Sequence, residues 1–233
     1  MKFARSLLAL SALAALVPVS VQAAPIRTLV YHFSYDARTF GTAPAAGGGT
    51  VYENGTFGTS ARAGTMTVEI MAATGDGGLV VDVTENVDRA ERPMQKIRCA
   101  VYGKTVDVIC DQGVGDTDEQ ETLLSYLGRF FYDPTLVDDK GHWHTTTMIK
   151  TASVVDDDFT VEKTDGSMLT IKIDRKKVGG GVKESRSGTM VYNADLVVPV
   201  SIHQEMSSQD SGAQGDQNVD LKLLSDSMAT KTP

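Results

Sequence analysis

The chain has 233 residues, of which 41% are hydrophobic and 22% charged, a composition too apolar for a disordered chain and ordinary for a folded domain. The formal net charge is −8, from 22 basic and 30 acidic side chains, so the basic surface that nucleic-acid binding requires is missing. With 22 glycines and 7 prolines, the sequence is neither collagen-like nor proline-rich.

Residues 1–23 have the pattern of a secretory signal peptide. Two basic residues precede an apolar stretch from Leu7 to Val19, and small residues follow that suit cleavage after Ala23. We expect this cut rather than one after Ala24, which would leave proline first. The apolar stretch is short for a membrane anchor. The sequence therefore predicts a periplasmic or secreted protein with a single mature domain, 24–233, and no membrane span after signal removal.

Most of the mature chain alternates apolar and polar residues, which is typical of strands buried on one face. The apolar faces are Leu29, Tyr31, Phe33 and Tyr35; Met66, Val68 and Ile70; Leu79, Val81 and Val83; Leu169, Ile171 and Ile173; Leu196, Val198, Val200 and Ile202; and Val219, Leu221 and Leu223. Parallel sheets show continuous apolar runs instead. We predict an all-β domain, an antiparallel, strongly curved sheet or barrel-like sandwich of about ten to twelve strands.

Glycine-rich turns suggest a hairpin between the second and third of these faces. The segment Gly75-Asp76-Gly77-Gly78 separates them. A two-residue loop at 75–76 places Ile70 opposite Val81 on the apolar face, and we expect that register.

A second hairpin follows Thr164-Asp165-Gly166. A two-residue Asp-Gly turn would mix the two faces. We therefore predict a three-residue loop with Gly166 in the left-handed conformation, which places Val161 opposite Leu169.

Three stretches with few large apolar residues, 41–50, 178–182 and 207–218, are predicted to be loops. Pro199 lies inside a clear strand pattern. Because proline has no backbone N–H, we expect that strand to lie at an edge of the sheet or to bulge there.

Cys99 and Cys110 are the two cysteines of the chain, and export would allow them to form a disulfide. Their spacing fits neither a zinc site nor a redox motif. A four-residue loop at 103–106 places Cys99 directly opposite Cys110 and Val101 opposite Val108. We expect this bridge, worth about 3 kcal/mol; two free thiols are the alternative.

One segment, 118–132, has the apolar spacing of an amphipathic helix. Its apolar residues, the hypothetical ligand-binding residues, are Leu123, Leu124, Leu127, Phe130 and Phe131. Asp118 and Glu121 form a capping box, and Pro134 follows the predicted end. We expect this helix to pack on the apolar face of the sheet.

The sequence contains few motifs that indicate catalysis or the binding of a metal or cofactor. His142 and His144 could point to one side of a strand, but two ligands do not make a metal site, and Trp143 is expected to face the core. The acidic segment 111–118 lacks the spacing of an EF-hand, and 156–158 is expected to be a turn. There is no nucleophile, phosphate or dinucleotide motif, so we predict no metal, no cofactor and no catalytic residues.

The layout resembles exported β-proteins in which a curved sheet surrounds a helix and holds lipids or lipoproteins, an analogy of architecture. We expect an exported, non-catalytic binding protein that holds an apolar small molecule between sheet and helix. The alternative is an envelope or extracellular protein-interaction module with a fully packed core. An exported hydrolase is the third hypothesis.

Overall fold

The computed structural model describes residues 24–42, 54–75, 77–89, 96–101, 108–111, 117–128, 131–149, 153–179, 182–209 and 213–228. Its elements, in chain order, are β1 (Arg27–Thr42), β2 (Asn54–Ala73), β3 (Leu79–Val87), β4 (Lys96–Val101), β5 (Val108–Cys110), α1 (Asp118–Ser125), β6 (His142–Ile149), β7 (Ser153–Asp165), β8 (Met168–Gly179), β9 (Val182–Asn193), β10 (Val198–Gln209) and β11 (Ala213–Asp226).

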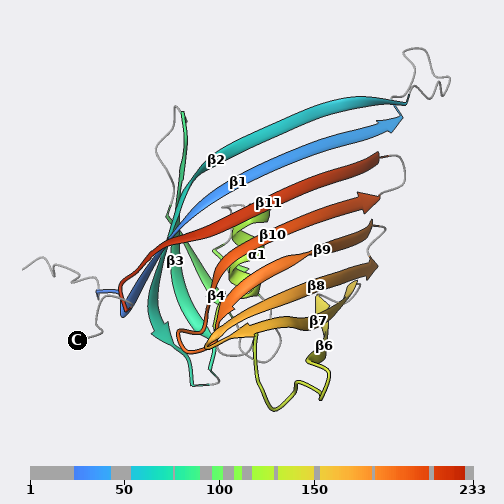
Figure 1. Cartoon of the computed structure of the whole chain (residues 1–233). Helices are drawn as coiled ribbons and strands as arrows, with labels where there is room; N and C mark the ends of the chain where they lie inside the picture. The colour runs from blue at the N-terminus through green and yellow to red at the C-terminus, as the bar shows by residue number, and fades with distance from the viewer. Residues whose placement is uncertain are drawn as a thin grey trace, which may run out of the picture.

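The described strands form one antiparallel sheet in the order β5-β4-β3-β2-β1-β11-β10-β9-β8-β7-β6. The ladder between β1 and β11 joins the first and last described strands in the middle of the sheet, and β5 and β6 are the edges of the sheet. The sheet is open, not closed into a barrel (Figure 1). The predicted all-β fold, with its number of strands and one helix, is confirmed. No helix in the described parts of the chain is long and apolar enough to span a membrane.

The sheet curves around α1, which lies against its inner face (Figure 1). Side chains of α1 contact strands on both sides of the sheet's centre. Glu119 is paired with Arg62 of β2, and Thr122 donates to Gln204 of β10. The helix therefore covers the concave side, and the inner residues of most strands form one core beneath it.

Two glycines allow strands to approach each other closely within this curved sheet. A Cβ atom on Gly64 of β2 would lie 1.9 Å from the carbonyl oxygen of Asn86, and one on Gly188 of β9 would lie 2.1 Å from that of His203. A side chain at either position would collide with the backbone of the neighbouring strand. Together with five register shifts in the ladders, these glycines accommodate the curvature.

The predicted pairing of β2 with β3 is confirmed, but the loop is different. Ile70 lies opposite Val81, as expected, and the ladder then continues to Ala73 and Leu79. The loop is therefore 74–78 rather than 75–76. A bulge between Ile70 and Ala72 takes up the additional residue, so the apolar face is kept although the loop is longer.

The predicted register of β7 and β8 is wrong by two residues. Val161 lies opposite Ile171, not Leu169, and the loop is Gly166–Ser167. Gly166 has a φ of 60°, the left-handed conformation we predicted. A bulge at Glu162 changes the alternation, so a two-residue turn no longer mixes the faces.

The polar stretch 207–218 was predicted to be a loop, and this prediction is wrong. β10 continues to Gln209 and β11 begins at Ala213, with paired residues over most of the stretch. In the predicted loop 41–50, the first two residues belong to β1, which runs to Thr42, and the rest lie outside the described residues. In the predicted loop 178–182, residues 178–179 belong to β8 and Val182 to β9, and residues 180–181 lie outside the described residues. A backbone ladder forms without apolar side chains, so polarity alone did not mark a loop.

Pro199 lies at a register shift between β10 and β9, which confirms one of the two expected solutions. The strand is not an edge, because β10 lies between β9 and β11 in the sheet, and the ladder between β10 and β11 begins at Ser201.

Cys99 of β4 lies directly opposite Cys110 of the edge strand β5, and the two residues form the predicted disulfide. Val101 lies opposite Val108, also as predicted, whereas the loop 103–106 is outside the described residues.

Candidate functional site

The predicted helix is shorter than expected. α1 ends at Ser125. Its last turn is closed by two backbone hydrogen bonds between residues three apart, accepted by the carbonyl oxygens of Leu123 and Leu124. Gly128 follows with a φ of 100°, a conformation that a helix cannot continue. The N-cap is Thr117, whose side chain accepts from the N–H of Gln120, rather than Asp118.

The hypothetical ligand-binding residues lie in the core. Leu123 and Leu124 are fully buried in α1, while Leu127 and Phe131 are buried in the segment after it. Phe130 lies outside the described residues. The four described side chains therefore share one apolar layer with the sheet, although only two of them belong to the helix.

Aromatic packing fills the space around Phe131. Its ring makes edge contacts with those of Tyr126, Trp143, Phe159 and Tyr192, at centroid distances of 5.1 to 5.8 Å. Such pairs stabilise a core beyond their buried area. The cavity beside these rings has a volume of about 10 Å3. Ligand pockets are typically about 300–1,000 Å3, so this part of the interior is packed.

The polar side of α1 is fixed to the sheet by charged hydrogen bonds. Tyr35 of β1 donates to Asp118 at 2.9 Å, and Arg62 of β2 pairs with Glu119 at 2.6 Å. Burial, together with the negative charge of Asp118, raises the pKa of Tyr35 to about 12. Burial also raises the pKa of Glu85, to which Thr117 donates. The N-terminal half of α1 is therefore held by charge and its C-terminal half by apolar packing.

The acidic run 156–158 is not a turn, which corrects the prediction. It lies in β7, where Asp157 is buried and accepts two bonds from the guanidinium of Arg175, at 2.6 and 3.1 Å. The guanidinium also lies over the ring of Tyr126, 5.7 Å from its centroid. The sequence did not predict this pair, because 156–158 was expected to be a turn rather than part of a strand.

His142 and His144 are exposed in β6, and Trp143 between them is buried, as the alternation predicted. His144 contacts Asp158 at 2.9 Å and Thr146 at 2.9 Å. Within the described ranges, no three side chains of His, Cys, Asp or Glu are placed to hold a metal ion.

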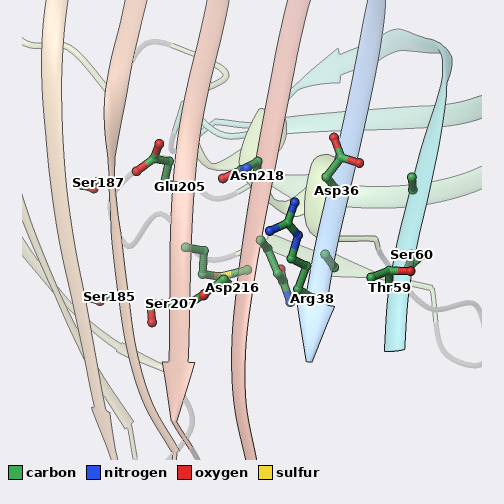
Figure 2. Close-up of a pocket in the computed structure, with 14 residues that line it drawn as sticks. Asp36, Arg38, Thr59, Ser60, Ser185, Ser187, Glu205, Ser207, Asp216 and Asn218 are labelled. Carbon is green, nitrogen blue, oxygen red and sulfur yellow. The ribbon is translucent and has the colours of Figure 1, made fainter. Parts of the chain in front are cut away.

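A shallow groove crosses the outer face of the sheet, away from α1, with a volume of about 660 Å3 (Figure 2). Nine of its ten labelled side chains alternate with inward-facing ones along β1, β2, β9, β10 and β11, so they point away from the core, whereas Ser60 lies opposite Ala37 on the inward-facing alternation at the end of the groove. The outer groove is defined by Asp36, Arg38, Thr59, Ser60, Ser185, Ser187, Glu205, Ser207, Asp216 and Asn218. It combines three carboxylates with one guanidinium, several hydroxyls and an amide.

A second depression of about 430 Å3 lies farther along β1, β9, β10 and β11 and extends to β8. It is lined by His32, Lys222, His203 and Asp220, the last two in contact at 2.7 Å. Neither depression was predicted from the sequence, because exposed polar residues on strands carry no motif. The only signal was the polar half of the period-two pattern.

No protein-family model matches the chain, and no curated protein has a significant sequence match to it.

Proposed function

We propose that the protein is an exported, non-catalytic interaction module that binds a polar partner in its outer groove. The observation that carries the proposal is the contrast between its two faces. Around Phe131 the inner face is packed, with a cavity of about 10 Å3, whereas the outer groove offers about 660 Å3.

The chemistry of the outer groove supports a polar partner. Charged and hydroxyl side chains from five neighbouring strands project together, and strands lie about 4.8 Å apart, so the surface is about 19 Å wide. Buried ligand pockets are mostly apolar, unlike this surface. An extended polar chain, such as a segment of another protein, could hydrogen-bond along it.

Export rests on the leader-like segment 1–23 and is supported by the disulfide between Cys99 and Cys110, because such bridges persist in oxidising compartments. We therefore place the module in the periplasm or outside the cell. Intact mass of protein from its own host should show loss of residues 1–23, and a retained leader would contradict this part of the proposal.

A photo-crosslinking amino acid tests the outer groove. We would place it at Ser187, inside the groove, and at Thr67, a position on the outward-facing alternation of β2 beyond the groove. The proposal expects one product in the native host from position 187 that is absent from position 67. Glu205→Ala should weaken that product. Equal products from the two positions would contradict the proposal.

Carriage of an apolar ligand between sheet and helix is the second candidate, favoured by the placement of α1 across the concave face (Figure 1). A carrier must move α1 or the segment containing Leu127 to admit the ligand. The discriminating probe is a fluorescent fatty acid: the interaction module binds none, whereas a carrier binds it saturably and with altered affinity in Leu127→Ala. Leu127→Asp should destabilise the fold whichever of the two functions is correct, because Leu127 is buried.

A further inference from the structure

The two edges of the described sheet differ in length and protection. β5 has three residues and is tied to β4 by the disulfide. β6 has eight, contains no proline, lysine, arginine, aspartate or glutamate, and pairs with β7 without a bulge. Natural proteins usually protect edges with such residues, with bulges or by keeping the strand short. β6 is therefore an edge suited to pairing.

The ladder between β6 and β7 shows which backbone groups face outward. The N–H of Val161 donates to the carbonyl oxygen of Gly141, so alternate residues counted from 141 bond to β7. The intervening residues direct their N–H and C=O groups to the free side. At His142 both groups are already occupied, because its N–H donates to the Asp138 carboxylate and its C=O accepts from the Asp138 N–H.

The next outward-facing positions are His144, Thr146 and Met148. Within the described ranges β6 pairs with no strand on this side, so three N–H and three C=O groups form a row that begins just beyond the Asp138 contact. This is enough to pair with a short extended segment, the mode of recognition in which a peptide adds a strand to a sheet.

The exposed β7 side chains beside this row are acidic. His144 contacts Asp158 and Thr146 contacts Asp156, two β7 residues whose side chains are 67% and 47% exposed. On the β8 side, Asp158 lies opposite Asp174, which pairs with Lys172, and Asp156 lies opposite Lys176, so the two β7 carboxylates are the acidic groups nearest the free edge. A segment paired with β6 would place alternate side chains near these carboxylates, within reach of long lysine or arginine side chains.

We propose that the free edge of β6, from His144 to Met148, binds an extended segment of a partner protein that carries lysine or arginine at alternate positions. The inference is independent of the outer groove, which lies on other strands. A second copy of the chain fits less well, because pairing of two β6 edges would bring both sets of β7 carboxylates together on one sheet.

The test uses two synthetic seven-residue peptides, Thr-Lys-Val-Lys-Val-Lys-Thr and the same sequence with glutamate for lysine. Binding to the disulfide-bonded mature protein is measured by NMR titration at low salt. We expect the lysine peptide to bind at least about tenfold more tightly than the glutamate peptide, and to slow hydrogen exchange at the amides of His144 and Thr146.

Thr146→Pro removes one outward-facing N–H and leaves the hydrogen bonds between β6 and β7 in place. Edge strands tolerate proline at such a position. Thr146→Val keeps the N–H and is the matched control. We expect the proline variant to lose binding of the lysine peptide by about tenfold or more and the valine variant to retain it. Asp158→Asn should reduce the preference for lysine over glutamate.

Three results would overturn the inference: no binding of the lysine peptide by the wild-type protein, equal binding of both peptides, or unchanged binding by Thr146→Pro. A dimer in solution that Thr146→Pro dissociates would assign the edge to a second copy instead. The exchange measurement on the wild-type protein decides the question even if the proline variant does not fold. None of these results bears on crosslinking in the outer groove.

Discussion

Replacement of Gly188 by alanine tests how the sheet obtains its curvature. The added Cβ would lie 2.1 Å from the carbonyl oxygen of His203 and 2.9 Å from the Cα of Gln204. Ordinary contacts of this kind begin at 3.4 Å, so β9 and β10 would have to separate locally by about 1.3 Å at fixed geometry. Both obstacles belong to the backbone of a central strand and cannot move away by a change of rotamer.

The expected loss of stability follows from that displacement. Overpacking by one methyl group costs about 1–3 kcal/mol, and a clash with backbone belongs at the upper end of that range. The lower entropy of the unfolded alanine chain returns about 0.4–1 kcal/mol. We therefore expect Gly188→Ala to lower the free energy of unfolding by about 2 kcal/mol, which lowers the Tm of a domain of this size by about 4–8 °C.

Gly75→Ala is the matched control, because a Cβ at Gly75 meets no atom within 4 Å. It should leave the free energy of unfolding unchanged or raise it by up to about 1 kcal/mol. Urea and thermal unfolding of both variants, followed by circular dichroism, provide the comparison. If Gly188→Ala is as stable as Gly75→Ala, then the close approach of β9 to β10 at Gly188 does not constrain the sheet, and our account of its curvature is wrong.

Three further predictions concern the disulfide, a buried carboxyl and the histidines of β6. Reduction of Cys99–Cys110 should lower the free energy of unfolding by about 3 kcal/mol, measured by urea titration with and without reductant; thiol labelling of both cysteines in unfolded, unreduced protein would show that they are not paired. Burial raises the pKa of Glu85, so the folded state loses stability as the pH rises through the raised value. Glu85→Gln should therefore stabilise the protein at neutral pH and have no effect well below the ordinary pKa of glutamate. A stability difference that persists at low pH would refute this cause. Chelation should leave the Tm unchanged, since His142 and His144 are exposed, whereas a drop reversed by zinc would identify a metal site.

The sequence predicted those features that follow from burial on one face. Cys99 and Cys110 had to lie directly opposite each other to bond, and that requirement defines the register of β4 and β5. The pairing of Ile70 with Val81 was predictable because both side chains lie on the apolar face. In both cases the side chains, rather than the loop, determined the alignment.

The errors have a common physical origin in features that do not alter hydrophobic periodicity. The bulge at Glu162 reverses the alternation of β7 and leaves no mark in the sequence, so the register was wrong. The apolar period continued past Gly128 because Phe131 is also buried, although the backbone is no longer helical. The polar ends of β10 and β11 have few apolar residues, yet their backbones pair as far as Gln209 and Gln214.

The charged pair between β7 and β8 depends on the corrected register and tests it. Asp157 and Arg175 lie directly opposite each other and are almost fully buried. Removal of one partner leaves the other charge buried without compensation, which costs about 3–5 kcal/mol. We therefore expect Asp157→Leu and Arg175→Met each to destabilise the protein by that amount in urea titrations.

The double variant distinguishes a required pair from a replaceable one. When both charges are replaced by apolar side chains of similar size, neither is left unpaired, and such replacements are often neutral or stabilising. Asp157→Leu with Arg175→Met should therefore recover most of the stability that each single variant loses, because the site lies against the ring of Tyr126. Additive losses in the double variant would show that the two residues do not act as a pair, and the register of β7 and β8 would then need revision.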